Sequence, residues 1–322
     1  MGKTMRATDY ARKARAVFNF NYTASLKAIN KKLESLNEKL VSVEGQLTSS
    51  KAALEDIRKE AQLRRRHDDA MRNIAMLPIF EEMRREYLPK QLGLLETVRK
   101  VAKDDLSFVR VGDGELKLAL DLASNLGFQK NSADLNRDLN EAMLGSQNRE
   151  DVLFGTPHMH RDRHWSMIWA RVWPEFREII ESASILGNAH VSRPMFFSVE
   201  GEAGVDAWRS VWRRKKVTVI TGKSSRFDLI PQLFDNVTSA NRIDSLDRHA
   251  YSDLPRIMSE VDSATETELF LVALGPAGTV LTKQIADTGR QAVDIGHISD
   301  SYLVAFEGGA RPESRAYSQP RQ

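Results

Sequence analysis

The sequence predicts an α/β domain with a largely parallel sheet and helices on both faces, preceded by a long α-helical coiled coil. An apolar repeat of 3.5 residues runs through an early segment, and from about residue 100 strand-like runs alternate with helical ones. Polar turns then follow three predicted strands, where open parallel sheets bind ligands. We therefore expect a helical segment over residues 1–95, the α/β domain over 96–306 and a polar, disordered tail over 307–322.

The composition is that of a soluble protein able to bury a sizeable core. Of the 322 residues 41% are hydrophobic, and no apolar run reaches the roughly 18 residues of a membrane span. The basic start lacks the apolar stretch of a secretory signal. Without cysteine there are no disulfides, thiolate nucleophiles or cysteine zinc sites, and a cytoplasmic location is expected.

The positive charge belongs to the N-terminal segment. Residues 1–100 hold 21 Lys/Arg against 13 Asp/Glu, whereas the remainder holds 26 against 31. The basic residues are interleaved with acids and lack aromatic partners, so no nucleic-acid partner is expected. The run at 64–66 is typical of a solvated helix face, with peripheral contact to an anionic membrane as the minority interpretation.

Apolar residues recur at alternating steps of four and three, a heptad pattern interrupted only by the polar Ser50. Its members are Tyr22, Leu26, Ile29, Leu33, Leu36, Leu40, Val43, Leu47, Ser50, Leu54, Ile57 and Ala61. So narrow a stripe is buried only against another helix, which predicts a homo-oligomer through this coil. The alternative is a single long helix folded back on its own globular domain.

The region after residue 100 has the spacing of βαβ units. Strands are predicted at 106–111, 151–155, 216–220, 268–274 and 291–295. A helix is expected from Glu115 to about Leu126, and another over 279–288. Trp165, Trp169 and Trp173 form an i, i+4, i+8 stripe that favours a buried core over a sugar platform.

The first polar turn carries two carboxylates, Asp113 and Glu115, on either side of a glycine. Both can reach one hard divalent cation, which bridges a diphosphate and neutralises charge on a leaving nucleotide. Arg110 can add a charge-assisted bond to the same phosphates. The spacing alone equally suits a turn in which Asp113 or Glu115 caps the next helix, and taken alone it favours that alternative.

The other two turns suit phosphate. The turn at 222–226 follows a strand and is basic and hydroxyl-rich, but Val217 replaces the upstream glycine of a nucleotide P-loop. The turn at 275–279 places backbone N–H groups at a helix N-terminus, which favours an anion. The dinucleotide fingerprint G-x-G-x-x-G is absent, so NAD binding is not expected.

Several titratable residues remain. His158, His160 and His164 have an H-x-H spacing without a clear third ligand, and solvated or helix-capping histidines are the favoured interpretation. Asp294 and His297 lie at the end of the last strand, where catalytic side chains belong in this architecture. A structural Asp–His pair explains them equally well.

Five sequence blocks occur in order and together resemble the GT-D glycosyltransferase family over about two hundred residues. They are R-V-G-D-G-E at 110–115, S-R-P at 192–194, L-F-D-N at 233–236, A-L-G-P-A-G-T-V-L at 273–281 and A-V-D-I-G-H at 292–297.

The resemblance implies a Rossmann-like, GT-D-type enzyme that moves a sugar from a nucleotide-sugar donor, typically a UDP-sugar, to a glycan or glycoprotein acceptor. Asp113 and Glu115 then form the site for Mn²⁺ or Mg²⁺. The implied donor-binding residues are Arg110, Gly112, Arg193, Lys223, Arg226, Gly275, Pro276 and Ala277.

The catalytic group is ranked as Asp294 first, His297 second and Asp300 third. The alternative function is a non-catalytic coiled-coil scaffold with a nucleotide-sugar-binding domain. Both metal-site carboxylates, Asp113 and Glu115, are present, which favours the enzyme. The sugar, the acceptor and the stereochemical outcome stay open.

Overall fold

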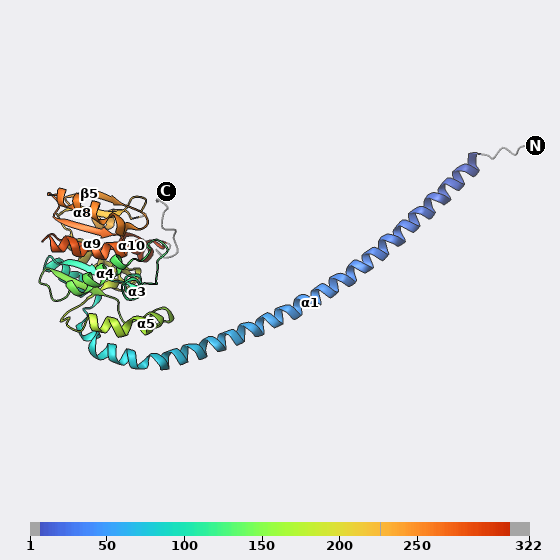
Figure 1. The fold of residues 1–322 in the computed structure, drawn as a ribbon. Coiled ribbons are helices and arrows are strands. Elements are labelled where there is room, and N and C mark those ends of the chain that lie inside the picture. Colours follow the sequence, from blue (N-terminus) through green and yellow to red (C-terminus); the bar gives the residue numbers. More distant parts are fainter. Residues whose placement is uncertain (1–6, 226, 310–322) are drawn as a thin grey trace, which may run out of the picture. The chain divides into compact units, whose positions relative to one another are not determined.

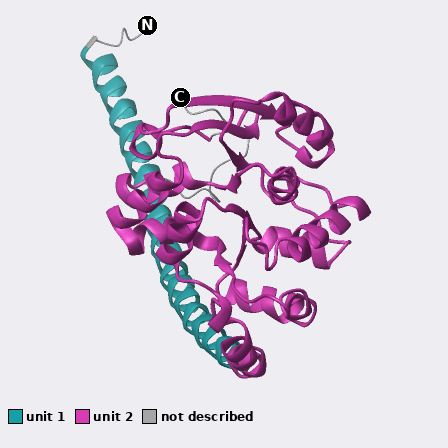
Figure 2. Ribbon diagram, turned by 90° about the vertical axis from the view of Figure 1, so that its left-hand side faces the viewer, with its two compact units in different colours: residues 1–71 teal, residues 72–322 magenta. Residues whose placement is uncertain are grey.

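The computed structural model describes residues 7–225 and 227–309, which divide into two compact units, 1–71 and 72–322 (Figure 2). Helix α1 (Ala7–Glu86) is continuous over 80 residues, confirming the long N-terminal helix. The division falls inside α1, ahead of the predicted domain start at residue 96. Met76, Phe80 and Met83, near the end of α1, are buried in the core of the second unit.

Two further expectations concern the C-terminal tail and membrane-spanning helices. Most of the predicted tail, from residue 310, lies outside the described residues. Within residues 7–225 and 227–309, no helix combines the length and apolar character needed to cross a membrane.

Within the described residues the second unit is built on a seven-stranded sheet in the order β3-β2-β1-β7-β6-β4-β5, with every pairing parallel. The strands are β1 (Ser107–Arg110), β2 (Val152–Thr156), β3 (Gly187–Asn188), β4 (Lys216–Gly222), β5 (Ser239–Ser245), β6 (Leu269–Ala273) and β7 (Ala292–Asp294). The predicted parallel α/β sheet is confirmed (Figure 1).

Helices cover both faces of the sheet. One core contains residues of α3 (Asp113–Leu120), α4 (Ala133–Gly145), α5 (Arg163–Ile179), α8 (Leu254–Ser263) and α9 (Pro276–Asp287). The other contains residues of α2 (Leu94–Lys103), α6 (Pro194–Val211), α7 (Pro231–Phe234) and α10 (Ile298–Glu307). Short 3-10 helices lie at η1 (Leu88–Lys90), η2 (Ala189–Ser192) and η3 (Ala250–Asp253).

The apolar runs of the strands explain this three-layer arrangement. Successive strand side chains point to opposite faces, so Leu269 and Leu271 of β6 join one core while Phe270 and Val272 join the other. A strand buried on both faces reads as a continuous apolar run rather than as an alternation. That is why the sequence marks β6 clearly.

Helix α3 differs from its prediction at both ends. It begins at Asp113 rather than Glu115, so both predicted metal-site carboxylates lie in its first turn. It ends at Leu120 rather than near Leu126, because the Asn136 side-chain amide donates 2.7 Å hydrogen bonds to the carbonyl oxygens of Leu118 and Ala119. Partners from outside the helix thus satisfy carbonyl groups that another turn would have used.

Helix α5 carries the tryptophan stripe. Trp169 and Trp173 are buried, and both rings lie about 6 Å from the ring of the buried Tyr87. Trp165 is half-buried and stacks on Trp169 with 5.5 Å between ring centroids. The stripe is therefore core, as its helical spacing predicted.

Candidate active site

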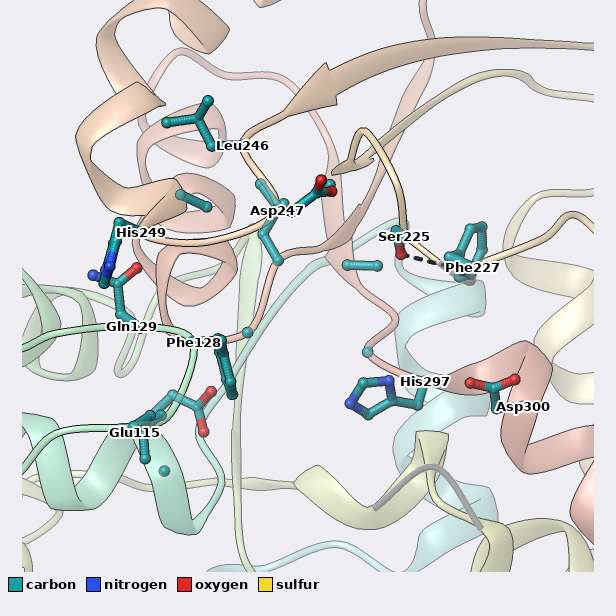
Figure 3. Close-up of a pocket in the computed structure, with 18 of the residues that line it drawn as sticks. Glu115, Phe128, Gln129, Ser225, Phe227, Leu246, Asp247, His249, His297 and Asp300 are labelled. Atoms are coloured by element: carbon teal, nitrogen blue, oxygen red, sulfur yellow. Dashed lines mark hydrogen bonds between the residues drawn. The ribbon is translucent and has the colours of Figure 1, made fainter. Parts of the chain in front are cut away.

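A cavity of about 330 Å³ opens at the carboxyl edge of the sheet, where the chain leaves five neighbouring strands. Its lining includes Arg110 at the end of β1, Gly222 at the end of β4, Asp247 beyond β5, Ala273 at the end of β6 and Gly296 beyond β7. We call it the strand-end cavity (Figure 3). Its position is where an open parallel sheet binds ligands.

Asp113 and Glu115 both line the strand-end cavity from the first turn of α3. The Glu115 Oε2 atom accepts the Gly112 N–H at 2.8 Å, so Glu115 fulfils the capping role that was its structural alternative. Asp113 Oδ2 lies 3.3 Å from both Lys117 Nζ and His164 Nε2. Burial raises the pKa of Glu115, and the nearby Arg110 charge opposes that rise.

Asp113 and Glu115 are the acidic residues of α3 that could offer carboxylate oxygens to a divalent cation at the cavity. Within the described residues, no group of three or more His, Asp or Glu side chains could hold a metal ion by itself. A cation here would complete its shell with substrate phosphates and water. Mg²⁺ characteristically binds in this way, and carboxylate oxygens suit Mn²⁺ as well.

Arg110 is anchored in the floor of the cavity. Its Nε donates to Asp294 Oδ1 at 3.0 Å, and its Nη1 donates to the Ala189 carbonyl at 3.4 Å. Both side chains of the Arg110–Asp294 pair are at least nine-tenths buried. Burial raises the pKa of Asp294, whereas Arg110 and the Gly296 N–H favour its ionised form. Asp294 accepts a hydrogen bond from Arg110 and is not among the residues that line the cavity.

The backbone at Gly296 makes room for the Arg110 guanidinium. A Cβ atom built on Gly296 would lie 1.8 Å from Arg110 Nη2, and the residue has a φ of +47°. No side chain fits there unless Arg110 moves. Gly296, the glycine of the A-V-D-I-G-H block, thus helps to position the Arg110 guanidinium in the cavity.

We expect Gly296→Ala to lower both the stability of the second unit and its affinity for a nucleoside diphosphate. Gly289→Ala is the matched control, because Gly289 also has a positive φ, +78°, but nothing lies within 4 Å of its built Cβ. The control should lose only about 1–2 kcal/mol of backbone conformational energy. Chemical denaturation and UDP titration measure the two effects, and equal losses in both variants would contradict the packing argument.

Arg193, His297 and Asp300 also line the strand-end cavity. Arg193 precedes α6, His297 is exposed at the start of α10, and Asp300 is buried in the first turn of that helix. Figure 3 draws His297 and Asp300 on one side of the cavity and Glu115 on the other. The fold therefore brings predicted site residues from β1, α3, α6 and α10 around one space.

The other predicted donor residues are placed less directly. Gly275 lines the cavity, but α9 begins at Pro276 rather than at residue 279, so Pro276 and Ala277 are buried in its first turn. Proline at the first helical position suits this start, since no helix bond is lost there. Lys223 is exposed and is not among the lining residues.

The remaining predicted donor residues are Gly112 and Arg226. Gly112 is the residue preceding α3, and its N–H is taken by Glu115. Arg226 lies outside the described residues.

Several residues of the cavity wall were not predicted from the sequence. Phe128 and Gln129 belong to the loop after α3, and a Cβ built on Gly275 would lie 3.1 Å from the Phe128 ring. Asp247 follows the unrecognised strand β5, and its Oδ1 accepts the Ser224 N–H at 2.6 Å. A carboxylate directly after a strand was the available signal, but β5 itself reads as polar.

The histidine prediction was wrong for His158 and His160, which are neither fully solvated nor helix caps. Both are half-buried, and the His160 ring lies 4.6 Å from His190 and 6.0 Å from Trp165. Burial lowers the pKa of both, and it lowers that of His190 further still, with His160 and Arg193 adding to the effect. These rings form a neutral aromatic cluster beside the β2 and β3 strand ends.

We expect this cluster to destabilise the second unit in mild acid. The unfolded chain takes up a proton on His190 near its ordinary pKa of about 6.5, whereas the folded chain resists until a much lower pH. Stability is therefore full above pH 6.5 and falls below it, by up to about 1.4 kcal/mol per pH unit for this one residue. His190→Asn should flatten the dependence between pH 6.5 and 5, while the exposed His67→Asn should not. Identical slopes in all three proteins would refute the assignment.

Comparison with known proteins identifies the family. The profile described as glycosyltransferase GT-D fold matches residues 108–314. The chain is 27% identical over 222 residues to glycosyltransferase GlyD of Streptococcus pneumoniae serotype 4, covering 65% of this chain and 27% of that protein. It is 30% identical over 231 residues to a probable glycosyl transferase, Gly, of Streptococcus gordonii, covering 68% and 33%. The chain thus spans a third or less of these relatives.

Solved structures agree on the fold. A structure reported as domain of unknown function 1792 with a distinct glycosyltransferase fold superposes with a TM-score of 0.64 at 24% identity, covering 76% of this chain and 91% of that one. A structure titled as a new glycosyltransferase from Streptococcus sanguinis gives 0.63 at 24% identity, covering 72% and 94%. The predicted resemblance is confirmed, and the chain belongs to the glycosyltransferase GT-D fold family.

Proposed function

We propose that the second unit transfers a sugar from a nucleotide-sugar donor, a UDP-sugar, to a glycan or glycoprotein acceptor with the help of Mn²⁺ or Mg²⁺. The observation that supports this proposal is the strand-end cavity, which two arginines and four carboxylates line at the carboxyl edge of a parallel sheet: Arg110, Arg193, Asp113, Glu115, Asp247 and Asp300. The relatives named as glycosyltransferases support the reaction class. Cytoplasmic location and self-association through the coil complete the proposal.

The arginines bind the donor diphosphate. The Arg110 guanidinium is held in a fixed orientation by Asp294 and Ala189. An arginine whose geometry is set before binding forms charge-assisted bonds to phosphate at a smaller entropic cost than a mobile one. Arg193 supplies a second cation on the same cavity.

The carboxylates make the metal part of the donor site. Asp113 and Glu115 share the cavity with the arginines, and a diphosphate bound beside two carboxylates is repelled unless a cation lies between them. A bound divalent ion supplies that neutralisation and stabilises the charge that develops on the departing nucleotide. The residues themselves hold and orient the donor, and the burial of Arg110 strengthens its ionic contacts.

The acceptor side is assigned to the start of α10. Asp300 and His297 line the cavity, whereas Asp294 is engaged with Arg110 beneath it. In an inverting transfer a side chain must take the proton of the acceptor hydroxyl, and we assign that role to Asp300, which lines the cavity. Asp294 acts through Arg110 as a positioning residue.

Calorimetric titration with UDP tests the donor assignment. Wild-type protein should bind UDP in the presence of Mn²⁺, bind it much more weakly after chelation with EDTA, and bind UMP weakly in both conditions because UMP lacks the second phosphate. UDP affinity that is indifferent to Mn²⁺ would contradict the metal site. Absence of UDP binding at millimolar concentration would contradict the donor assignment itself.

A further inference from the structure

The heptad stripe of α1 is an unpartnered apolar face within the first unit. Its large members, from Leu26 at 44% exposure to Leu54 at 65%, remain open to solvent in the single chain. An isolated helix gains little stability without burying an apolar face. Residues 22–61 therefore need a partner helix. The residue types in and beside the stripe indicate how many helices associate and in which orientation.

The spacing fixes each position of the stripe, because the step from a to d is three residues and from d to a is four. The a positions are leucines followed by one alanine: Leu26, Leu33, Leu40, Leu47, Leu54 and Ala61. The d positions include three β-branched residues: Ile29, Val43 and Ile57. Leucine at a with β-branched residues at d is the reverse of the two-stranded preference and favours three or four strands.

The flanking charges favour parallel helices. In a parallel, in-register coil each g residue faces the e residue five positions later on its neighbour, which pairs Lys39 with Glu44 of the next copy. Glu60 and Arg65, which lies just beyond the stripe, would form a second opposite pair if the coil continues past Ala61. The remaining g–e pairs of the stripe contain no like charges. A fully overlapped antiparallel pairing instead sets Asn37 against Glu44 and gains no opposite pair.

We propose that residues 22–61 of three or four copies of this chain associate as a parallel, in-register coiled coil. The occupant of the exposed face is thus the same segment of further copies. In this arrangement the chains all continue toward residue 72 from one end of the coil. Several strand-end cavities then serve one acceptor at raised local concentration, a consequence that rests on the proposed function.

Sedimentation equilibrium of the full chain tests the number of copies independently of any activity. Wild-type protein should have three or four chain masses at micromolar concentration. A core-exchanged variant should fall to two chain masses; it carries Leu26→Ile, Leu33→Ile, Leu40→Ile, Leu47→Ile, Leu54→Ile, Ile29→Leu, Val43→Leu and Ile57→Leu. The control Val41→Leu with Leu63→Ile, both exposed residues off the stripe, should keep the wild-type mass. A wild-type monomer or dimer, or an unchanged mass in the exchanged variant, would overturn the proposal.

Energy transfer between single labels tests orientation, since the chain has no cysteine of its own. Ala24→Cys and Lys59→Cys both lie at outward f positions. In a parallel coil, mixed donor- and acceptor-labelled Ala24→Cys chains transfer efficiently, whereas Ala24→Cys mixed with Lys59→Cys transfers poorly across about 50 Å of helix. The reverse ranking would establish antiparallel helices and overturn the proposed orientation.

Discussion

Replacing Asp113 by Asn together with Glu115 by Gln is expected to abolish Mn²⁺-dependent UDP binding, with at least a hundredfold loss of affinity. The amides keep the shape of both side chains, and the carbonyl oxygen of the introduced glutamine can still accept the Gly112 N–H that Glu115 accepts at 2.8 Å. The thermal transition should therefore stay close to that of the wild type. What disappears is the negative charge that a divalent cation requires of its ligands.

The matched control for this variant is Asp134→Asn with Glu141→Gln, which removes two exposed carboxylates of α4 away from the cavity. It should bind UDP as the wild type does in the presence of Mn²⁺. Unchanged UDP affinity in the Asp113→Asn, Glu115→Gln protein would contradict the proposed metal site.

The second large effect separates Asp294 from Asp300. Asp294→Asn should cost about 3 kcal/mol of folding free energy, because it leaves the Arg110 charge buried without its carboxylate partner. Donor affinity should fall with it, since Arg110 loses its anchor. Asp300→Asn should instead keep donor affinity and lower turnover by roughly a hundredfold or more if the transfer inverts configuration.

Chemical denaturation, UDP titration and single-turnover rates measure these outcomes separately. If the Asp294→Asn protein has wild-type stability but reduced turnover, Asp294 is a catalytic group, the role for which it ranks first among the residues predicted from the sequence. Near-wild-type turnover in both variants would show that the base lies elsewhere or that the reaction uses none.

The sheet was predictable where its strands are buried. β6 and β2 are continuous apolar runs because helices cover both faces, and such runs are visible in the sequence. β5 lies at the sheet edge with most of its residues exposed, so its polar residues carry no such signal. The end of α3 was misplaced because the Asn136 side chain, distant in sequence, supplies the bonds that terminate it.

The site was predictable where strand ends alone determine position. Arg110, Asp113 and Glu115 lie at the carboxyl end of β1 and in the helix turn after it, the edge where an open parallel sheet binds ligands, and the family resemblance selects them from other polar turns. The contact of Asp294 with Arg110 was not predictable, because it depends on the pairing of β1 with β7. Phe128 and Asp247 reach the cavity from loops whose paths depend on tertiary packing.

The most direct test of the central claim is nucleotide release from a panel of nucleotide sugars incubated with the protein and Mn²⁺, with and without glycan or glycoprotein acceptors. We expect UDP release from at least one UDP-sugar, abolished by EDTA and by the Asp113→Asn, Glu115→Gln double replacement. UDP binding without release from any donor would contradict it and would indicate a non-catalytic nucleotide-sugar-binding scaffold.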